Sequence, residues 1–307
     1  MIARWSGIAV FACWLASCAQ QTARPIPARQ TAIADPKVQP LAPAYPSEAE
    51  IAAGHAIEKS DPATSPSASP WRADQPLSDS LAAGGAVRVR ARVTDGSSSA
   101  GLEAIVFDSC RCAVRVVDQP YADAGGGAIA AAMRENRAVG GVNGGYFTPE
   151  FQPVGLMISA GRPTGAFSTT ALLSGVVVST DDVPRLLWRN EYSRSAGATD
   201  LVQAGPRLVD ASRPLPSLDR MKRRPRTFIA TDGGYTWAAG MVESISLGEL
   251  AELLASPDVI PGFHVARALN LDGGRSSAIW MRTAAGAEIS KPGWSTVRNF
   301  IAIVPRS

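Results

Sequence analysis

The segment Asn270–Ser277, N-L-D-G-G-R-S-S, places one carboxylate, two glycines and two hydroxyls directly after an apolar run. Such a turn can simply close a strand, because an aspartate often hydrogen-bonds to its own backbone in turns. It can also form the floor of a site, since glycines let the backbone approach a ligand closely. With an ordinary pKa of about 3.9, Asp272 is ionised and suited to act as a base or a hydrogen-bond acceptor.

A second glycine turn lies at Gly141–Glu150, G-V-N-G-G-Y-F-T-P-E. Asn-Gly is a strong hairpin signal, so an ordinary turn is one interpretation. However, the flanking residues do not alternate as in a hairpin, and a second glycine followed by two aromatics exceeds what a turn requires. We therefore expect Gly144 and Gly145 to let a ligand reach backbone N–H groups. Asn143 and Tyr146 are candidates for contacts with the same ligand.

These two turns belong to an ordered set of motifs that resembles the phosphodiester glycosidase family. The family pattern has an N-G-G-[YF]-F segment, a P-x-G strand, a G-P-x-L segment, an R-T strand, a helix beginning S-L-x-E-L-A and an L-D-G-G-G-S-S turn. All of them occur here in that order, over roughly Leu102 to Val304. One position departs from the pattern, because Arg275 replaces the third glycine of the last motif. This cation either narrows the site or adds a phosphate contact.

The resemblance implies hydrolysis of the bond between a sugar and a phosphodiester. The leaving group is a phosphate monoester with a second pKa near 6, so it needs less protonation than an alcohol. One of the two carboxylates of an ordinary glycosidase is then dispensable. We assign water activation or sugar orientation to Asp272, and the holding of sugar hydroxyls or of the attacking water to Asn143.

Phosphate recognition calls for arginines and hydroxyls, because charge-assisted hydrogen bonds are the strong ones. Arg226 is the first candidate, since it alone enters a predicted strand from the basic run Arg220–Arg226, and Arg207 is the second. Further predicted substrate-binding residues belong to the last glycine motif, and its serines either donate to phosphate or close the turn. They are Gly273, Gly274, Ser276 and Ser277. A similar Asp-Gly-Gly sequence at Asp232–Gly234 lies between two apolar runs and predicts a plain hairpin.

The elements that must position these residues are mostly short strands. Val87–Val93 alternates strictly between apolar and polar residues, and similar runs recur up to the C-terminus. Helical spacing is found at Ala128–Asn136 and after Ser246, where Ser246 and Glu249 form a predicted capping box. The pattern predicts a mixed α+β fold with largely antiparallel strands in one domain, residues 86–307.

The N-terminal residues predict export. Residues 1–17 form a short apolar signal peptide, too short to span a bilayer. It ends in L-A-S-C, which resembles the lipobox of bacterial lipoproteins and implies a lipid on Cys18. The alternative is an ordinary signal peptide cleaved elsewhere. Residues 18–85 are rich in Pro, Ala and Ser and predict a disordered tether. We expect an envelope location, on the periplasmic or cell-surface face of a bacterial membrane.

Composition excludes several other classes of function. The net charge of +3 is too small to indicate nucleic-acid binding, and no metal-binding or nucleotide-binding motif is present, so we expect neither metal nor cofactor. Cys110 and Cys112 are interpreted as structural thiols or a strained local disulfide.

The sequence therefore predicts a lipid-anchored hydrolase acting on a sugar-1-phosphodiester in an envelope or extracellular glycan. The alternative is a glycan-binding lipoprotein without catalysis, which the altered position Arg275 favours. A third interpretation is an enzyme acting on a different ester, such as a peptidoglycan or lipid-linked intermediate.

Overall fold

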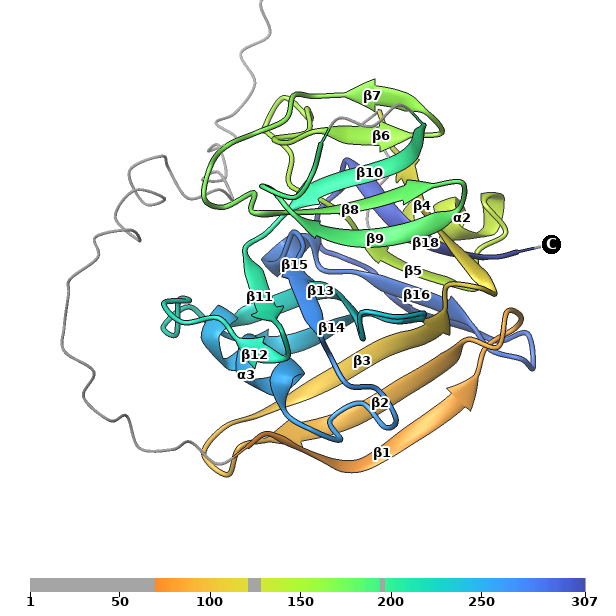
Figure 1. Ribbon diagram of the computed structural model, residues 1–307. Helices are drawn as coiled ribbons and strands as arrows, with labels where there is room; N and C mark the ends of the chain where they lie inside the picture. The colour runs from red at the N-terminus through yellow and green to blue at the C-terminus, as the bar shows by residue number, and fades with distance from the viewer. Residues whose placement is uncertain (1–69, 121–127, 194–196, 307) are drawn as a thin grey trace, which may run out of the picture. The chain divides into compact units, whose positions relative to one another are not determined.

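The computed structural model describes residues 70–120, 128–193 and 197–306 (Figure 1). In this part of the chain the strands form three antiparallel sheets, accompanied by two α-helices and one short 3-10 helix. The predicted α+β class with largely antiparallel strands is therefore confirmed. The predicted signal peptide, Cys18 and residues 18–69 of the predicted tether lie outside the described residues.

The largest sheet has eight strands and contributes three of the segments predicted for the site. In spatial order the strands are β1 (Arg72–Ser80), β2 (Val87–Thr94), β3 (Ser99–Asp108), β14 (Thr236–Ile245), β13 (Arg224–Thr231), β15 (Arg267–Asn270), β11 (Arg207–Asp210) and β12 (Arg213–Pro214). The hairpin predicted at Asp232–Gly234 is confirmed, because it joins β13 to β14. Asp232 closes it by accepting hydrogen bonds from the N–H groups of Gly234 and Thr236, at 2.7 and 3.1 Å.

Two five-stranded sheets complete the β-structure. One consists of β7 (Arg162–Thr164), β6 (Met157–Ser159), β10 (Ala198–Ala204), β8 (Gly175–Thr180) and β9 (Val183–Trp188). The other consists of β17 (Glu288–Lys291), β16 (Ile279–Arg282), β5 (Gly140–Asn143), β18 (Asn299–Pro305) and β4 (Cys112–Asp118). Its strand β5 carries the first glycine turn of the predicted site.

One apolar cluster is shared by all three sheets. It includes Ile105 and Leu269 from the eight-stranded sheet, Val177 from the sheet of β8, and Val142 and Ile301 from the sheet of β5. These side chains are almost completely buried. Because burial of apolar surface is the main favourable term in folding, the sheets stabilise one another through this cluster. The ends of β5, β13 and β15 are thereby held together in space.

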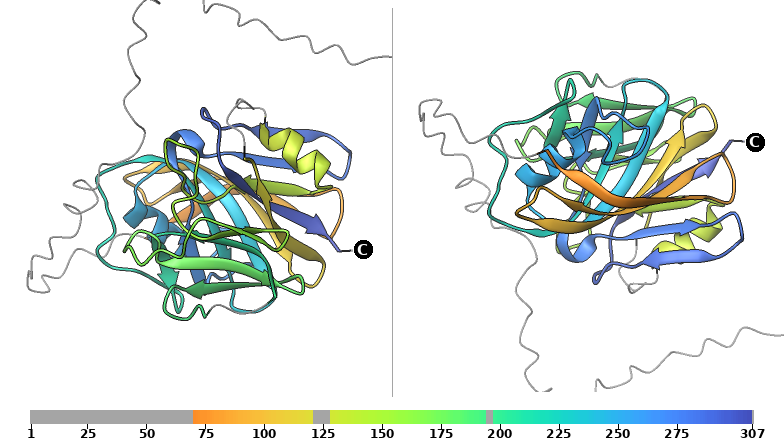
Figure 2. Two further views of the ribbon diagram at one scale, coloured as in Figure 1. Left: turned by 90° about the horizontal axis from the view of Figure 1, so that it is seen from above. Right: turned by 90° about the horizontal axis from the view of Figure 1, so that it is seen from below.

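Two helices cover the outer faces of the sheets (Figure 2). α2 (Ala128–Glu135) packs on β5, β16 and β18, and α3 (Leu247–Ala255) packs on β11, β12 and β14. The predicted capping box of α3 is confirmed: Ser246 Oγ accepts from the Glu249 N–H at 3.3 Å, and Glu249 Oε2 accepts from the Ser246 N–H at 2.9 Å. No helix in the described ranges is long and apolar enough to cross a bilayer.

Strand β1 lies inside the range that composition assigned to the tether. It pairs with β2 at the edge of the eight-stranded sheet. Just before it, Trp71 is 2% exposed and belongs to the apolar cluster beneath α3. The Trp71 N–H also donates to Ser256 Oγ at 3.1 Å. The folded part of the chain therefore begins earlier than residue 86. The buried Trp71, just before β1, anchors a strand that is mostly polar.

The two cysteines of the folded domain are both free. Cys110 is exposed, whereas Cys112 is buried at the start of β4. Burial raises the pKa of the Cys112 thiol. Of the two interpretations given above, this structure shows thiols.

Candidate functional site

Three of the predicted segments meet at the side chain of Asn143, the last residue of β5. Its amide nitrogen donates to the backbone carbonyl of Asp272 at 2.7 Å. Its amide oxygen accepts from the Thr227 hydroxyl at 2.7 Å and from the Ala278 N–H at 3.0 Å. One buried amide thus joins β5 to β13 and to the turn after β15. Both lone pairs of its oxygen are used inside the protein, so the geometry favours a positioning role over the predicted contact with water or sugar.

Asp272 has the environment of a proton-exchanging group. The residue is 7% exposed. Its Oδ1 accepts a hydrogen bond from the Gly273 N–H at 2.9 Å, whereas its Oδ2 is buried without a hydrogen-bond partner in the described residues. Burial raises the pKa of Asp272 to about 7, and the Ser276 hydroxyl and the Gly273 N–H oppose this shift only in part. This differs from the ordinary, fully ionised aspartate that the sequence suggested, and it suits a residue that gives or takes a proton near neutral pH.

The two glycines after Asn143 are required by packing within the protein. A methyl group on Gly144 would lie 1.9 Å from Asn299 Oδ1, and one on Gly145 would lie 2.8 Å from Val202 Cγ1. The Gly145 N–H donates to Asn299 Oδ1 at 2.8 Å. The space beside these glycines is therefore filled by protein atoms, and the predicted close approach of a ligand is not needed to explain them.

Tyr146 links the first glycine turn to the segment before β11. Its hydroxyl donates to the Gly205 carbonyl at 2.6 Å and accepts from Asn270 Nδ2 at 2.8 Å. The same Asn270 amide also donates to the Gly205 carbonyl, at 2.9 Å. Tyr146 and Asn270 therefore join the first glycine turn and the end of β15 to the segment before β11.

Arg226 is a partly buried cation beside the Asp272 turn. A methyl group on Gly273 would lie 3.6 Å from Arg226 Cδ, which places the arginine stem against that turn. The guanidinium donates to the carbonyls of Ile245 (3.3 Å) and Lys222 (2.9 Å). No carboxylate lies within ion-pair distance of it in the described ranges. Burial lowers the pKa of Arg226, although a guanidinium stays protonated at neutral pH. Tyr146 and Asp219 partly oppose this shift in pKa, and the charge of Arg224 adds to it.

Arg207 lies in a different cluster. Its guanidinium is 5.1 Å from the centroid of the Trp188 ring, which Arg267 also contacts at 4.9 Å, and its Nη1 is 4.0 Å from Asp210 Oδ2. Strand β11 pairs with β15, where Arg207 lies opposite Leu269, but among the described residues the Arg207 side chain forms no hydrogen bond or ion pair with Asp272. The structure therefore brings Arg226 to the Asp272 turn and shows Arg207 elsewhere.

The second glycine motif continues into a short 3-10 helix, η1 (Gly274–Ser276). Gly274 has a φ of +64°, which favours glycine. Ser277 Oγ is buried and has no hydrogen-bond partner in the described part of the chain.

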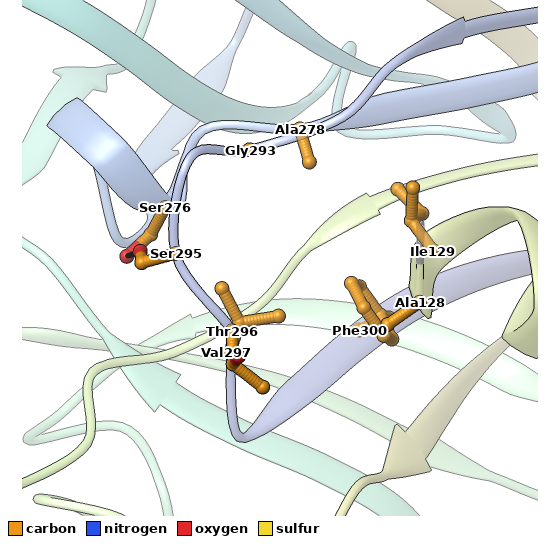
Figure 3. Close-up of a pocket in the computed structure, with 9 residues that line it drawn as sticks. All are labelled: Ala128, Ile129, Ser276, Ala278, Gly293, Ser295, Thr296, Val297 and Phe300. Carbon is orange, nitrogen blue, oxygen red and sulfur yellow. Dashed lines mark hydrogen bonds between the residues drawn. The ribbon is translucent and has the colours of Figure 1, made fainter. Parts of the chain in front are cut away.

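Behind η1 is a cavity of about 10 Å³ (Figure 3), which is room for about one water molecule. Ser276 and Ser295 lie together on one side of it, with their hydroxyl oxygens 3.5 Å apart, and Ile129 and Phe300 lie on the other. The lining is completed by Ala128, Ala278, Gly293, Thr296 and Val297.

Three buried polar residues of this region were not singled out from the sequence: Thr227, Asn270 and Asn299. Each signal was present. Thr227 is the threonine of the R-T strand, Asn270 opens the second glycine motif, and Asn299 is a polar residue at the start of the apolar run F-I-A-I-V. A buried polar side chain needs partners, so an asparagine beside an apolar strand predicts hydrogen bonds to another segment.

The arrangement combines a carboxyl group able to exchange a proton with an arginine whose stem packs against the same turn and whose guanidinium has no ion-pair partner among the described residues. That pair can bind an anionic ester and move a proton to or from water. No group of three or more His, Cys, Asp or Glu side chains placed to hold a metal ion occurs in the described residues.

This fold and motif order have known counterparts. The phosphodiester glycosidase family matches residues 136–304, so the chain belongs to that family, as its motifs predicted. A similar solved structure is the zebrafish N-acetylglucosamine-1-phosphodiester alpha-N-acetylglucosaminidase catalytic domain, auto-inhibited by its pro-peptide. It is 16% identical with a TM-score of 0.50, over 79% of this chain and 85% of that one.

Two further solved structures match more weakly. A hypothetical protein from Synechocystis has 16% identity and a TM-score of 0.47, over 72% of this chain and 62% of that one. A putative exported protein from Burkholderia pseudomallei has 14% identity and a TM-score of 0.46, over 67% and 74%. No curated protein sequence matches the chain.

Proposed function

We propose that the protein hydrolyses a sugar-1-phosphodiester by breaking the bond between the anomeric carbon and the phosphate oxygen. Family membership supports a glycosidase-type hydrolase. The observation that carries the proposal is that Asp272, buried with a pKa of about 7, lies in a turn against which the stem of Arg226 packs.

In the proposed reaction, water attacks the anomeric carbon while ionised Asp272 accepts a proton from that water. The bond to the phosphate oxygen breaks, and its electron pair leaves with the phosphate monoester. Arg226 binds the phosphate through charge-assisted hydrogen bonds. Because the departing monoester is a good leaving group, no second carboxyl group has to protonate it. Asn143 holds the Asp272 turn in position through the Asp272 carbonyl.

The position of bond cleavage can be tested with water labelled with ¹⁸O. A panel of sugar-1-phosphodiesters is incubated with the protein, and the products are analysed by mass spectrometry. We expect the label in the free sugar, because water attacks carbon. Label in the phosphate monoester would instead show attack at phosphorus and contradict the proposal. Tight binding of the panel without product release would support the alternative of a glycan-binding module.

Variants test the assigned residues. Asp272→Asn removes the base and should lower kcat about 100-fold or more. Arg226→Ala should raise KM about 10- to 100-fold, since charge-assisted hydrogen bonds contribute about 1.5–3 kcal/mol each. The chain offers matched controls: Asp232→Asn makes the same change in the other Asp-Gly-Gly turn, and Arg162→Ala removes an exposed arginine from β7. Wild-type rates in both site variants would refute the assignments.

We further propose that the protein is exported, anchored by a lipid on Cys18, and acts on an envelope or extracellular glycan. The support is the signal sequence that ends L-A-S-C and the Pro-rich segment after it. Mass spectrometry of the mature N-terminus tests the anchor: a diacylated Cys18 is expected, and a different mature N-terminus would contradict it.

A further inference from the structure

Trp294 is the most exposed aromatic side chain in the described residues. It is 85% exposed. Its position is well defined, because the N–H groups of Trp294 and Ser295 both donate to the Arg275 carbonyl, at 2.7 and 3.2 Å. The backbones pack closely here, since a methyl group on Gly293 would lie 2.9 Å from that same carbonyl oxygen. The backbone of Trp294 is therefore held against η1, which directly follows Asp272 and Gly273, and its indole is exposed there.

The nearby arginines differ in whether they have a counter-charge. Arg220 and Arg223 pair with Glu252 and Glu249, respectively. By contrast, Arg224 and Arg275 are exposed and have no carboxylate within ion-pair distance among the described residues.

Arg224 also lies close to the Asp272 turn. A methyl group on Gly274 would lie 4.0 Å from Arg224 Cδ, and Arg224 is close enough to Arg226 to lower the pKa of that guanidinium by charge repulsion. Arg224, at the start of β13, and Arg275, within η1, thus add two cations without carboxylate partners near the Asp272 turn. Exposed like charges with no counter-charge repel one another, and a bound anion relieves that repulsion.

We infer that Arg224, Arg275 and Trp294 form an outer subsite, which binds the next unit of a polymer in which sugars alternate with phosphodiesters. This rests on the proposed function and assigns its substrate class. The guanidinium groups suit the second phosphate, because Arg binds phosphate oxygens with a planar fork of donors. The indole face suits the C–H face of the adjoining sugar ring. Arg275 occupies a position where the family pattern has glycine, so this subsite is a property of this chain.

A polymer fits these residues better than a membrane surface does. Around the indole the chain reads K-P-G-W-S-T, so its immediate neighbours are small or polar. A peripheral membrane surface needs a contiguous apolar face beside its cations. One isolated ring among polar residues suits stacking on a single sugar.

The test compares N-acetylglucosamine-1-phosphate oligomers that contain one or four phosphodiesters. For the wild type we expect KM for the longer oligomer to be at least 10-fold lower. Arg275→Gly and Trp294→Ala should each remove most of that difference, with kcat on the longer oligomer preserved. Both changes are at exposed positions, and Arg275→Gly restores the family residue, so both variants should fold. Arg162→Ala should keep the wild-type preference. Equal KM values in the wild type, or an unchanged preference in both variants, would overturn the inference.

A binding experiment separates this inference from the proposed function. Calorimetric titration of the wild type and the Trp294→Ala variant with the longer oligomer measures binding even if nothing is hydrolysed. Absence of hydrolysis together with Trp294-dependent binding would refute the proposed function alone. Hydrolysis of both oligomers with equal KM would refute the subsite alone. Sedimentation with phosphatidylglycerol vesicles provides the last control: Trp294-dependent vesicle binding with no oligomer preference would assign this surface to a membrane.

Discussion

The environment of Asp272 links catalysis to stability. Its pKa is raised to about 7 by burial, so the native state binds this proton more tightly than the unfolded chain does. Below the ordinary aspartate pKa the carboxyl is neutral in both states. As pH rises toward 7 the unfolded chain loses the proton first, and stability falls.

We therefore predict that Asp272→Asn inactivates the enzyme and yet raises its free energy of unfolding relative to the wild type. This gain should be larger at pH 8 than at pH 5. The gain between pH 5 and pH 8 has an upper limit of roughly 3 kcal/mol, because part of the effect of the shift from 3.8 to about 7 is already present at pH 5. Thermal unfolding at the two pH values measures it, with Asp232→Asn as the control. A stability difference that does not grow with pH would show that Asp272 titrates normally.

Asn143 should behave as a structural residue. Asn143→Ala leaves the Thr227 hydroxyl and the Ala278 N–H buried without an acceptor, so it should cost about 3 kcal/mol of stability. Chemical denaturation measures this cost. Asn190→Ala, at an exposed turn, should change stability by less than about 0.5 kcal/mol. Lost activity with unchanged stability would instead indicate that Asn143 contacts the substrate.

At the scale of single residues, the sequence predicted which segments meet but not what each side chain contacts. Asn143, Asp272 and Arg226 came together as expected from their motifs. The neighbour of Gly144 is Asn299, and the partner of Arg207 is Trp188, and both lie in other elements of the chain. Such distant partners leave no trace in local spacing. The pKa of Asp272 depends on burial, which the motif alone does not reveal.

At the scale of elements, the sequence predicted those helices and turns that depend only on neighbouring residues. The α3 helix begins at its capping box, and the turn Asp232–Gly234 closes a hairpin between two apolar strands. Strand β1 was missed because its sequence, R-A-D-Q-P-L-S-D-S, is polar and contains proline, as edge strands often are. Its place in the sheet depends on pairing with β2 and on the neighbouring Trp71.

Trp71 should therefore contribute far more to stability than β1 itself. Trp71→Ala removes a ring that is 2% exposed, and a cost of about 3–5 kcal/mol is expected. Leu77, in β1 and 51% exposed, supplies the control, because Leu77→Ala should change stability by less than about 0.5 kcal/mol. Urea denaturation of both variants distinguishes them. Equal, small effects would mean that the residues before 81 are dispensable for the fold.

At the scale of the whole molecule, the candidate site is assembled from two sheets rather than from one loop. Asp272 and Arg226 come from the eight-stranded sheet, whereas Asn143 comes from the sheet of β5. The apolar cluster that all three sheets share holds these parts together.

Activity and tertiary structure should consequently be lost in one transition. Trp188 and Trp280 are buried in two different sheets, so their fluorescence reports on both. In a urea titration we expect residual activity and fluorescence to fall at the same midpoint. Activity that disappears at a clearly lower urea concentration would show that the site loosens independently of the core.

The burial of Asp272 between these sheets determines how mutations elsewhere in the core would affect the pH dependence of activity. Any substitution that lets water enter between β5 and β15 would hydrate the Asp272 carboxylate. Its pKa would then fall toward that of a solvent-exposed aspartate. The acidic limb of the pH–activity profile, where ionisation of Asp272 switches activity on, would then move to lower pH before the fold itself is lost. The pH–activity profile would thus report whether water has access to the interface between the sheets.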